Sequence, residues 1–146
     1  RGTVFRLSNA FGAPVTAQVN RWTLLANDLC RQAVEKGRLM LNSNGCQWRD
    51  VICLSDVEEG IARFLQRTKI PEHYIYNLGS GVSMRVMDMA DAIIRSAVTV
   101  LQKNIPLELP AGCAPSEEPA LHFSIYRLLA EGYEIPNEVE LELERL

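Results

Sequence analysis

The 146-residue sequence lacks the features of several protein classes. It has no run of eighteen apolar residues, so we expect no membrane-spanning helix. It has no charged-then-apolar leader ending in small residues, so we expect no signal peptide. Its basic residues are too sparse, and too poor in interleaved aromatic side chains, to predict a nucleic-acid surface. With 47% hydrophobic residues, the chain is expected to form one domain with its own core.

Cysteine and histidine are also too dispersed to indicate a metal site. Zinc sites need four ligands at close paired spacings. None of Cys30, Cys46, Cys53 and Cys113 belongs to a C-x-x-C pair. We therefore predict free thiols in a reduced, cytoplasmic protein, with Cys30 and Cys53 packed among apolar neighbours.

The net charge of −3 is unevenly distributed along the chain. Residues 1–50 carry seven Lys and Arg against three acids, a balance of +4, so the remaining residues carry −7. A basic first third suits an anionic small ligand. Ordinary solvated charge explains the same asymmetry, so both interpretations stay open at this point.

Apolar periodicity predicts strands that alternate with helices. The expected strands are short and lie at residues 3–8, 39–41, 48–54 and 74–78. The first of them is expected to be buried. The expected helices are capped by Asn20, Asp56 and Ser83, with a shorter helix at Leu121–Ala130 and a last one from Glu138 to Leu146. A few short strands with several helices indicate an α/β fold.

Two further features of the pattern concern packing and completeness. The second expected helix should bury a stripe formed by Val57, Ile61, Phe64 and Leu65. Both ends of the pattern look unfinished, and the first residue is Arg1 rather than Met. We therefore expect a piece of a longer polypeptide or a trimmed chain.

Arg49 and Asn9 are the candidate ligand-binding residues. Arg49 can present a planar fork of donors to a phosphate, or it can form a surface pair with Asp50. Asp50, in turn, can hold that guanidinium or cap local backbone donors. Asn9 follows the carboxyl end of an expected strand, where ligands bind in open α/β sheets, although Asn in this position also forms turns.

A glycine-rich turn, Gly79-Ser80-Gly81, has the strand-then-helix context of a dinucleotide-binding loop. Met84 stands where the third glycine of G-x-G-x-x-G belongs, so a plain tight turn is favoured. No G-x-S-x-G elbow occurs, and neither histidine has an evident catalytic partner.

Three segments together resemble the extended short-chain dehydrogenase/reductase family, specifically its NAD-dependent sugar-nucleotide epimerases and dehydratases. The family's L-R-x-x-N-x-Y-G-P is similar to F-R-L-S-N-A-F-G-A-P at Phe5–Pro14. Its G-x-x-x-R-D-F-I-x-V-x-D-V is similar to G-C-Q-W-R-D-V-I-C-L-S-D-V at Gly45–Val57. Its Y-N-V-G-S-G-x-x-x-S is similar to Y-N-L-G-S-G-V-S at Tyr76–Ser83, and the order and separations also match.

The resemblance implies the C-terminal part of a Rossmann-type enzyme. Residues 1–146 would form a single substrate-binding domain that includes one late strand of the cofactor-domain sheet. Asn9 and Arg49 would contact the phosphates of a nucleoside-diphosphate sugar. The residues expected along the base are Leu39, Met40 and Leu41, and those near a helix start that closes over the substrate are Trp22 and Thr23. The Gly-Ser-Gly segment would be a structural turn.

The sequence also departs from the family's pattern. The family's glycine-rich NAD loop and its Y-x-x-x-K catalytic pair precede the first matching motif, so both would lie before Arg1. The resemblance therefore implies NAD(P) in a parent enzyme, whose Tyr moves a proton while NAD takes and returns a hydride. The isolated chain is expected to bind no cofactor and to be inactive. The family's R-x-G-D stretch, which supplies a second phosphate-binding Arg, is replaced by Ala111–Pro119, with acids and no Arg.

The leading expectation is thus the substrate-binding portion of an isomerase or lyase of polysaccharide biosynthesis. One alternative is a stand-alone, non-catalytic module that binds a nucleotide sugar or forms a homo-oligomer through an exposed sheet edge. The other is a purely structural α/β domain that binds no nucleotide.

Overall fold

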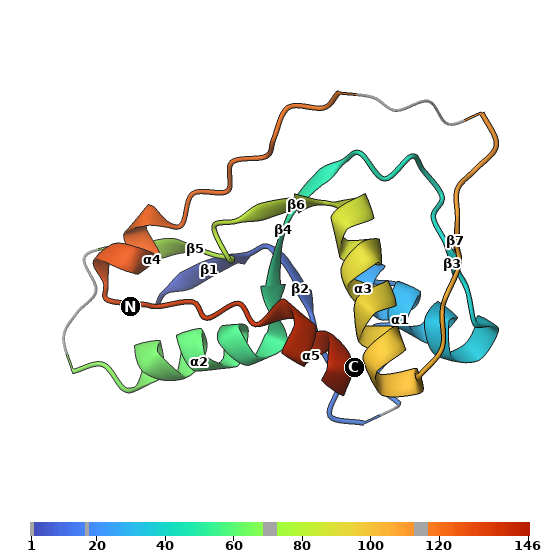
Figure 1. Cartoon of the computed structure of the whole chain (residues 1–146). Coiled ribbons are helices and arrows are strands. Elements are labelled where there is room, and N and C mark those ends of the chain that lie inside the picture. The colour runs from blue at the N-terminus through green and yellow to red at the C-terminus, as the bar shows by residue number, and fades with distance from the viewer. Residues whose placement is uncertain (1, 17, 69–72, 113–116) are drawn as a thin grey trace.

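The computed structural model describes residues 2–16, 18–68, 73–112 and 117–146, and within them strands and helices mostly alternate along the chain (Figure 1). The strands are β1 (Val4–Leu7), β2 (Asn9–Phe11), β3 (Leu39–Met40), β4 (Trp48–Cys53), β5 (Ile75–Leu78), β6 (Ser83–Arg85) and β7 (Leu107–Glu108). The helices are α1 (Leu25–Lys36), α2 (Leu54–Leu65), α3 (Val86–Leu101), α4 (Tyr126–Ala130) and α5 (Val139–Arg145). The predicted α/β class is confirmed.

β1 and β2 form one nearly continuous extended segment that changes its partner strand halfway. β1 pairs in parallel with β5, whereas β2 pairs in parallel with β4. The change occurs around Ser8, whose N–H still donates to the Leu78 carbonyl oxygen at 2.9 Å. The carboxyl end of β1 lies here, and ligands bind in open α/β sheets outside the carboxyl ends of strands, so this point is the first place to look for a site.

β4 lies at the centre of the molecule because it has a partner on each edge. β2 is its parallel neighbour and β6 its antiparallel neighbour. Side chains alternate across a strand, and on β4 Val51 and Cys53 enter one hydrophobic core while Ile52 enters another. The larger core lies under α1, α3 and α5, and the smaller one between β5, α2 and α4. Figure 1 shows α1 and α3 on one side of β4 and α2 on the other.

α1 ends at a glycine, and a small two-stranded sheet follows it. Gly37 takes the left-handed conformation after Lys36, with φ of 63°, and its N–H donates to Ala33. β3 then pairs in parallel with β7, far along the chain.

No helix within the described ranges is both long and apolar enough to cross a membrane.

One correction concerns the first strand, which we expected to be buried. Val4 is 56% exposed and Leu7 is 49% exposed. Phe5, which follows Val4, packs against Phe64 of α2. Strands of parallel sheets are usually covered on both faces. Among the described residues β1 has one neighbouring strand, β5, and Val4 and Leu7 keep about half of their surface exposed.

The expected helix caps are also wrong, because turns and strand pairing occupy those positions instead. α1 begins only at Leu25, five residues after Asn20. β4 runs directly into α2, so Asp56 lies inside the first turn rather than before it. Ser83 begins β6, paired with β4, and the capping box of α3 is formed by Arg85 and Asp88.

Two further expectations, the buried stripe of α2 and the length of α4, hold only in part. α2 is rotated so that Asp56 and Gly60 face the interior beside Tyr133, and Val57 and Phe64 also pack inward. The other two residues of the expected stripe, Ile61 and Leu65, are exposed. The helix expected at Leu121–Ala130 shortens to α4, because the segment before it runs extended and accepts a 2.7 Å hydrogen bond from Asn77 at the Ser124 carbonyl.

Candidate functional site

Two surface hollows meet beside Arg49. One, of about 260 Å³, lies at the point where the first strand segment changes partner, and it is lined by Leu7, Ser8, Asn9, Ala10, Phe11, Leu24, Leu25, Ala26, Arg49, Val51 and Met89. The other, of about 300 Å³, lies between α1 and β3, and it is lined by Leu25, Asp28, Leu29, Met40, Leu41, Asn42, Ser43, Gln47, Arg49 and Val86. Arg49 and Leu25 line both, so the two hollows flank one cationic side chain.

Arg49 reaches the hollows because of its position on β4. Its side chain alternates with that of Asp50 and therefore shares a face with Val51, which lines the first hollow. Nη1 of Arg49 donates to the carbonyl oxygen of its neighbour Trp48 at 2.8 Å. Within the described residues the guanidinium has no carboxylate partner, so most of its donors face solvent.

Asp50 is fully buried and binds the glycine-rich turn, not Arg49. Its carboxylate accepts hydrogen bonds from the Ser80 N–H at 3.0 Å, the Ser80 hydroxyl at 3.1 Å and the Gly81 N–H at 2.8 Å. Of the two roles open from the sequence, Asp50 therefore caps local backbone donors, and the surface Arg–Asp pair does not form.

The same contact explains the glycines of this turn. A Cβ on Gly79 would lie 2.5 Å from Oδ1 of Asp50 and 2.6 Å from the ring of Phe123. Gly81 has φ of 75°, a conformation that disfavours other residues. The segment is a tight structural turn packed on a buried carboxylate, as favoured from the sequence.

Asn9 lies next to Arg49 in space and is partly committed to the fold. One hydrogen of its Nδ2 amide goes to the Asp50 carbonyl oxygen at 2.9 Å, which ties β2 to β4. The amide has a second hydrogen and an acceptor oxygen, and the side chain is exposed. Beside it, the hydroxyl of Ser8 is buried and has no hydrogen-bond partner among the described residues.

The loop beyond β2 is held by a second buried amide. Nδ2 of Asn27 in α1 donates to the Gly12 carbonyl at 3.1 Å, and its Oδ1 accepts from the Gly12 N–H at 3.5 Å. Because Asn27 is only 2% exposed, these bonds fix the start of α1 against the end of β2. They therefore hold together two parts of the first hollow's wall, the end of β2 and the start of α1.

The remaining candidate residues divide into two groups. Met40 and Leu41 line the second hollow. Leu39 is completely buried in the larger core and does not line either hollow. Trp22 and Thr23 precede α1 and also stay outside both linings, where the adjacent Leu24 and Leu25 stand instead.

Three further residues line the hollows without being marked in the sequence: Ser8, Asp28 and Gln47. Ser8 adjoins Asn9, and the strand-end position that marked Asn9 could have included it. Asp28 carries no such signal, since an acid in the first turn of a helix is common on a solvated face. Gln47 lies in the loop between β3 and β4, so its place beside the hollow depends on the path of that loop.

The buried thiols do not add nucleophiles to the site. Burial raises the pKa of Cys30 to about 12. Burial, together with the nearby carboxylates of Asp56 and Glu142, raises the pKa of Cys53 to about 12 as well. Both pack among apolar side chains as predicted, and both stay as unreactive thiols at neutral pH. Cys113 lies outside the described residues.

Comparison with known proteins agrees with this geometry. The model of the NAD dependent epimerase/dehydratase family matches residues 1–79, more than half of the chain. The chain belongs to this family. A search of curated proteins finds no match.

Solved structures of this kind share the fold at low sequence identity. UDP-glucuronic acid 4-epimerase from Bacillus cereus, in complex with UDP-glucuronic acid and NAD, superposes with a TM-score of 0.73 at 19% identity over 98% of this chain. UDP-N-acetylglucosamine 4-epimerase from Methanobrevibacter ruminantium, in complex with UDP-N-acetylmuramic acid, gives 0.72 at 16% identity over 97%. UDP-glucose 4-epimerase from Thermus thermophilus, in complex with NAD, gives 0.68 at 20% identity over 97%.

The matched regions define which part of such a fold the chain represents. Each of these three proteins is covered over 43% of its own length, so the chain spans less than half of them. The fold is therefore that of the C-terminal part of Rossmann-type epimerases and dehydratases, as the sequence predicted.

Proposed function

We propose that this chain is the substrate-binding part of an NAD-dependent enzyme that epimerises or dehydrates a nucleoside-diphosphate sugar. The observation that carries the proposal is Arg49, a cation without a carboxylate partner among the described residues, at the junction of two hollows. A nucleotide sugar has the matching form, since its diphosphate joins a nucleoside on one side to a sugar on the other. A guanidinium fork suits that diphosphate.

The two hollows then receive the two ends of the ligand. The base lies along Met40 and Leu41, in the hollow between α1 and β3, as the resemblance implies. The sugar enters the hollow beside Ser8 and Asn9, where the second amide hydrogen of Asn9 is available to a phosphate oxygen. Two of the expected binding residues, Trp22 and Thr23, have no part in this arrangement, and Leu39 supports it only from the core.

The redox and proton-transfer groups are supplied from outside these residues. None of the four tyrosines of the sequence has Lys four positions later, so the chain has no Y-x-x-x-K pair. We propose that NAD, its glycine-rich loop and that pair belong to a preceding NAD-binding part, and that the present chain binds and orients the substrate. The open side of β1 fits a further parallel strand from that part.

Calorimetric titration of the chain with UDP-glucose tests the binding site. Replacing Arg49 by Ala should weaken binding by about 1.5–3 kcal/mol, the range for hydrogen bonds to a charged group. Arg95→Ala is the matched control, because Arg95 is an exposed arginine of α3 that pairs with Glu140 and lines neither hollow. Equal affinities of the Arg49→Ala variant and the unmodified chain would contradict the proposal.

A second candidate function is self-association without catalysis, and the open side of β1 favours it. Val4 and Leu7 expose apolar surface next to a strand edge that has no partner strand among the described residues. If two copies pair there, sedimentation velocity should show a dimer that Val4→Lys converts to a monomer. If the edge instead receives an NAD-binding part, the chain alone sediments as a monomer and gains NAD-dependent turnover only when that part is supplied.

A further inference from the structure

The hollow between α1 and β3 has opposite charges in its lining. Arg49 enters it from β4, and Asp28 enters it from the first turn of α1. Apolar side chains form much of the remaining wall, among them Leu29 and Leu41. A ligand in this hollow therefore meets hydrogen-bond donors at the arginine and acceptors at the aspartate.

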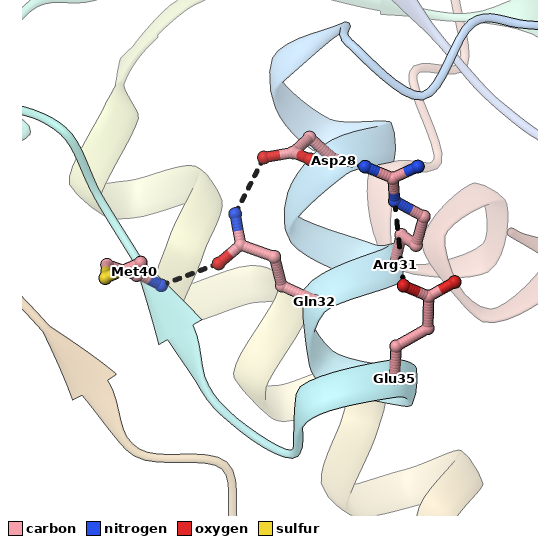
Figure 2. Close-up of polar contacts among 5 residues, drawn as sticks. All are labelled: Asp28, Arg31, Gln32, Glu35 and Met40. Atoms are coloured by element: carbon pink, nitrogen blue, oxygen red, sulfur yellow. Dashed lines mark hydrogen bonds and ion pairs between the residues drawn. The ribbon is translucent and has the colours of Figure 1, made fainter.

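The carboxylate of Asp28 is held in place by Gln32, one helical turn further along α1. Nε2 of Gln32 donates to Oδ2 of Asp28 at 2.7 Å, and Oε1 of Gln32 accepts from the backbone N–H of Met40 at 2.8 Å. Figure 2 shows Gln32 between Asp28 and Met40 of β3. Because Gln32 is only 7% exposed, its amide has little freedom, so it fixes Asp28 relative to β3.

The charge of Asp28 is partly balanced but its acceptor capacity is not exhausted. Nη2 of Arg31 donates to Oδ1 of Asp28 at 3.3 Å, and Nε of Arg31 lies 4.0 Å from Oε2 of Glu35. A carboxylate has about four lone-pair positions, so each oxygen of Asp28 can accept a further hydrogen bond. Its side chain is 36% exposed and within reach of a ligand.

We propose that Asp28 accepts a hydrogen bond from a ribose hydroxyl and thereby favours ribonucleotides over deoxyribonucleotides. The inference rests on the proposed function, which places the diphosphate at Arg49 and the base along Met40 and Leu41. Ribose joins base to phosphate, so it must lie between these residues, in the hollow that Asp28 lines. The hydroxyls of ribose are donors, whereas phosphate oxygens are acceptors only, and a carboxylate repels them. Arg31 reduces that repulsion.

Binding of nucleoside diphosphates by the full chain tests this assignment. Uridine, cytidine, adenosine and guanosine diphosphates are titrated by calorimetry, and the tightest binder is compared with its 2′-deoxy and 3′-deoxy forms. We expect at least one deoxy form to bind about tenfold more weakly or worse, the loss for one hydrogen bond to a charged acceptor. Asp28→Ala should reduce the ribonucleotide to the affinity of that deoxy form and leave the deoxy form itself unchanged.

Glu35→Ala is the matched control, because Glu35 is an acid of the same helix that also pairs with Arg31 but does not line the hollow. It should keep the preference for ribose. Tight binding without any ribose preference, or an Asp28→Ala variant that weakens every nucleotide equally, would overturn the assignment while leaving the proposed function intact. Absence of binding by all four diphosphates would overturn both.

Discussion

Replacing Asp50 by Ala should destabilise the fold, because it removes the acceptor of one buried and one part-buried backbone donor. The N–H groups of Ser80 and Gly81 both donate to this carboxylate. The Ser80 hydroxyl is less affected, since its single hydrogen can turn to the Val82 carbonyl oxygen, 2.8 Å away. A buried orphaned N–H costs about 1–3 kcal/mol, and water can replace part of the bond to the exposed Gly81, so the expected loss of unfolding free energy is about 2–3 kcal/mol.

Asp50→Asn separates the charge from the shape of this side chain. The amide keeps one acceptor oxygen but directs an NH₂ group at a donor, so we expect a smaller loss of about 1–2 kcal/mol. Urea denaturation followed by tryptophan fluorescence measures both variants. Asp91→Ala, at an exposed position of α3, is the control and should change stability by no more than about 0.5 kcal/mol. A loss below about 1 kcal/mol for Asp50→Ala would refute the role of the carboxylate as the anchor of the turn.

Two further predictions concern stability. Burial, with Glu142 and Glu138 nearby, raises the pKa of Asp56 above 3.8, so the folded chain binds this proton more tightly than the unfolded chain. The stability that this proton contributes is lost as pH rises through the folded pKa. Urea denaturation at several pH values between about pH 4 and pH 7 should therefore show the unfolding free energy of Asp56→Asn rising relative to that of the unmodified chain. A constant difference over this range would contradict the prediction. Gly79→Ala should cost about 1–3 kcal/mol through its clash with Asp50, measured by the same denaturation, whereas Gly2→Ala, with nothing within 4 Å, should be neutral.

Four of the seven strands in the described residues, and the fold class, could be predicted because apolar alternation is a local signal, whereas β2, β6 and β7 were not expected. The expected strand at residues 74–78, for example, corresponds to β5. Burial could not be predicted in the same way, since it depends on neighbours. β1 has the composition of a buried strand, but among the described residues β5 alone pairs with it, and Val4 therefore stays exposed. Cap positions failed similarly, because pairing of β6 with β4 gave Ser83 a partner that its local sequence does not indicate.

The candidate site could be predicted in part. Asn9 and Arg49 were selected from separate motifs, and parallel pairing of β2 with β4 brings them together at one hollow. Asp28 and Gln32 could not be selected, because their connection to β3 exists only after α1 has turned back at Gly37. A helical acid and amide four residues apart are common on solvated faces, and nothing in their spacing marks a ligand site.

The neighbouring Arg49 and Asp50 show why a shared motif can serve two separate purposes. Alternation along β4 sends one side chain to the hollows and the other into the interior. The aspartate holds the turn after β5 through its carboxylate and holds Asn9 through its backbone carbonyl. It therefore sets the distance between the two candidate phosphate-binding residues without touching a ligand. Asp50 therefore holds the backbone around Arg49 in place, and of these two side chains it is Arg49 that is available for an anion.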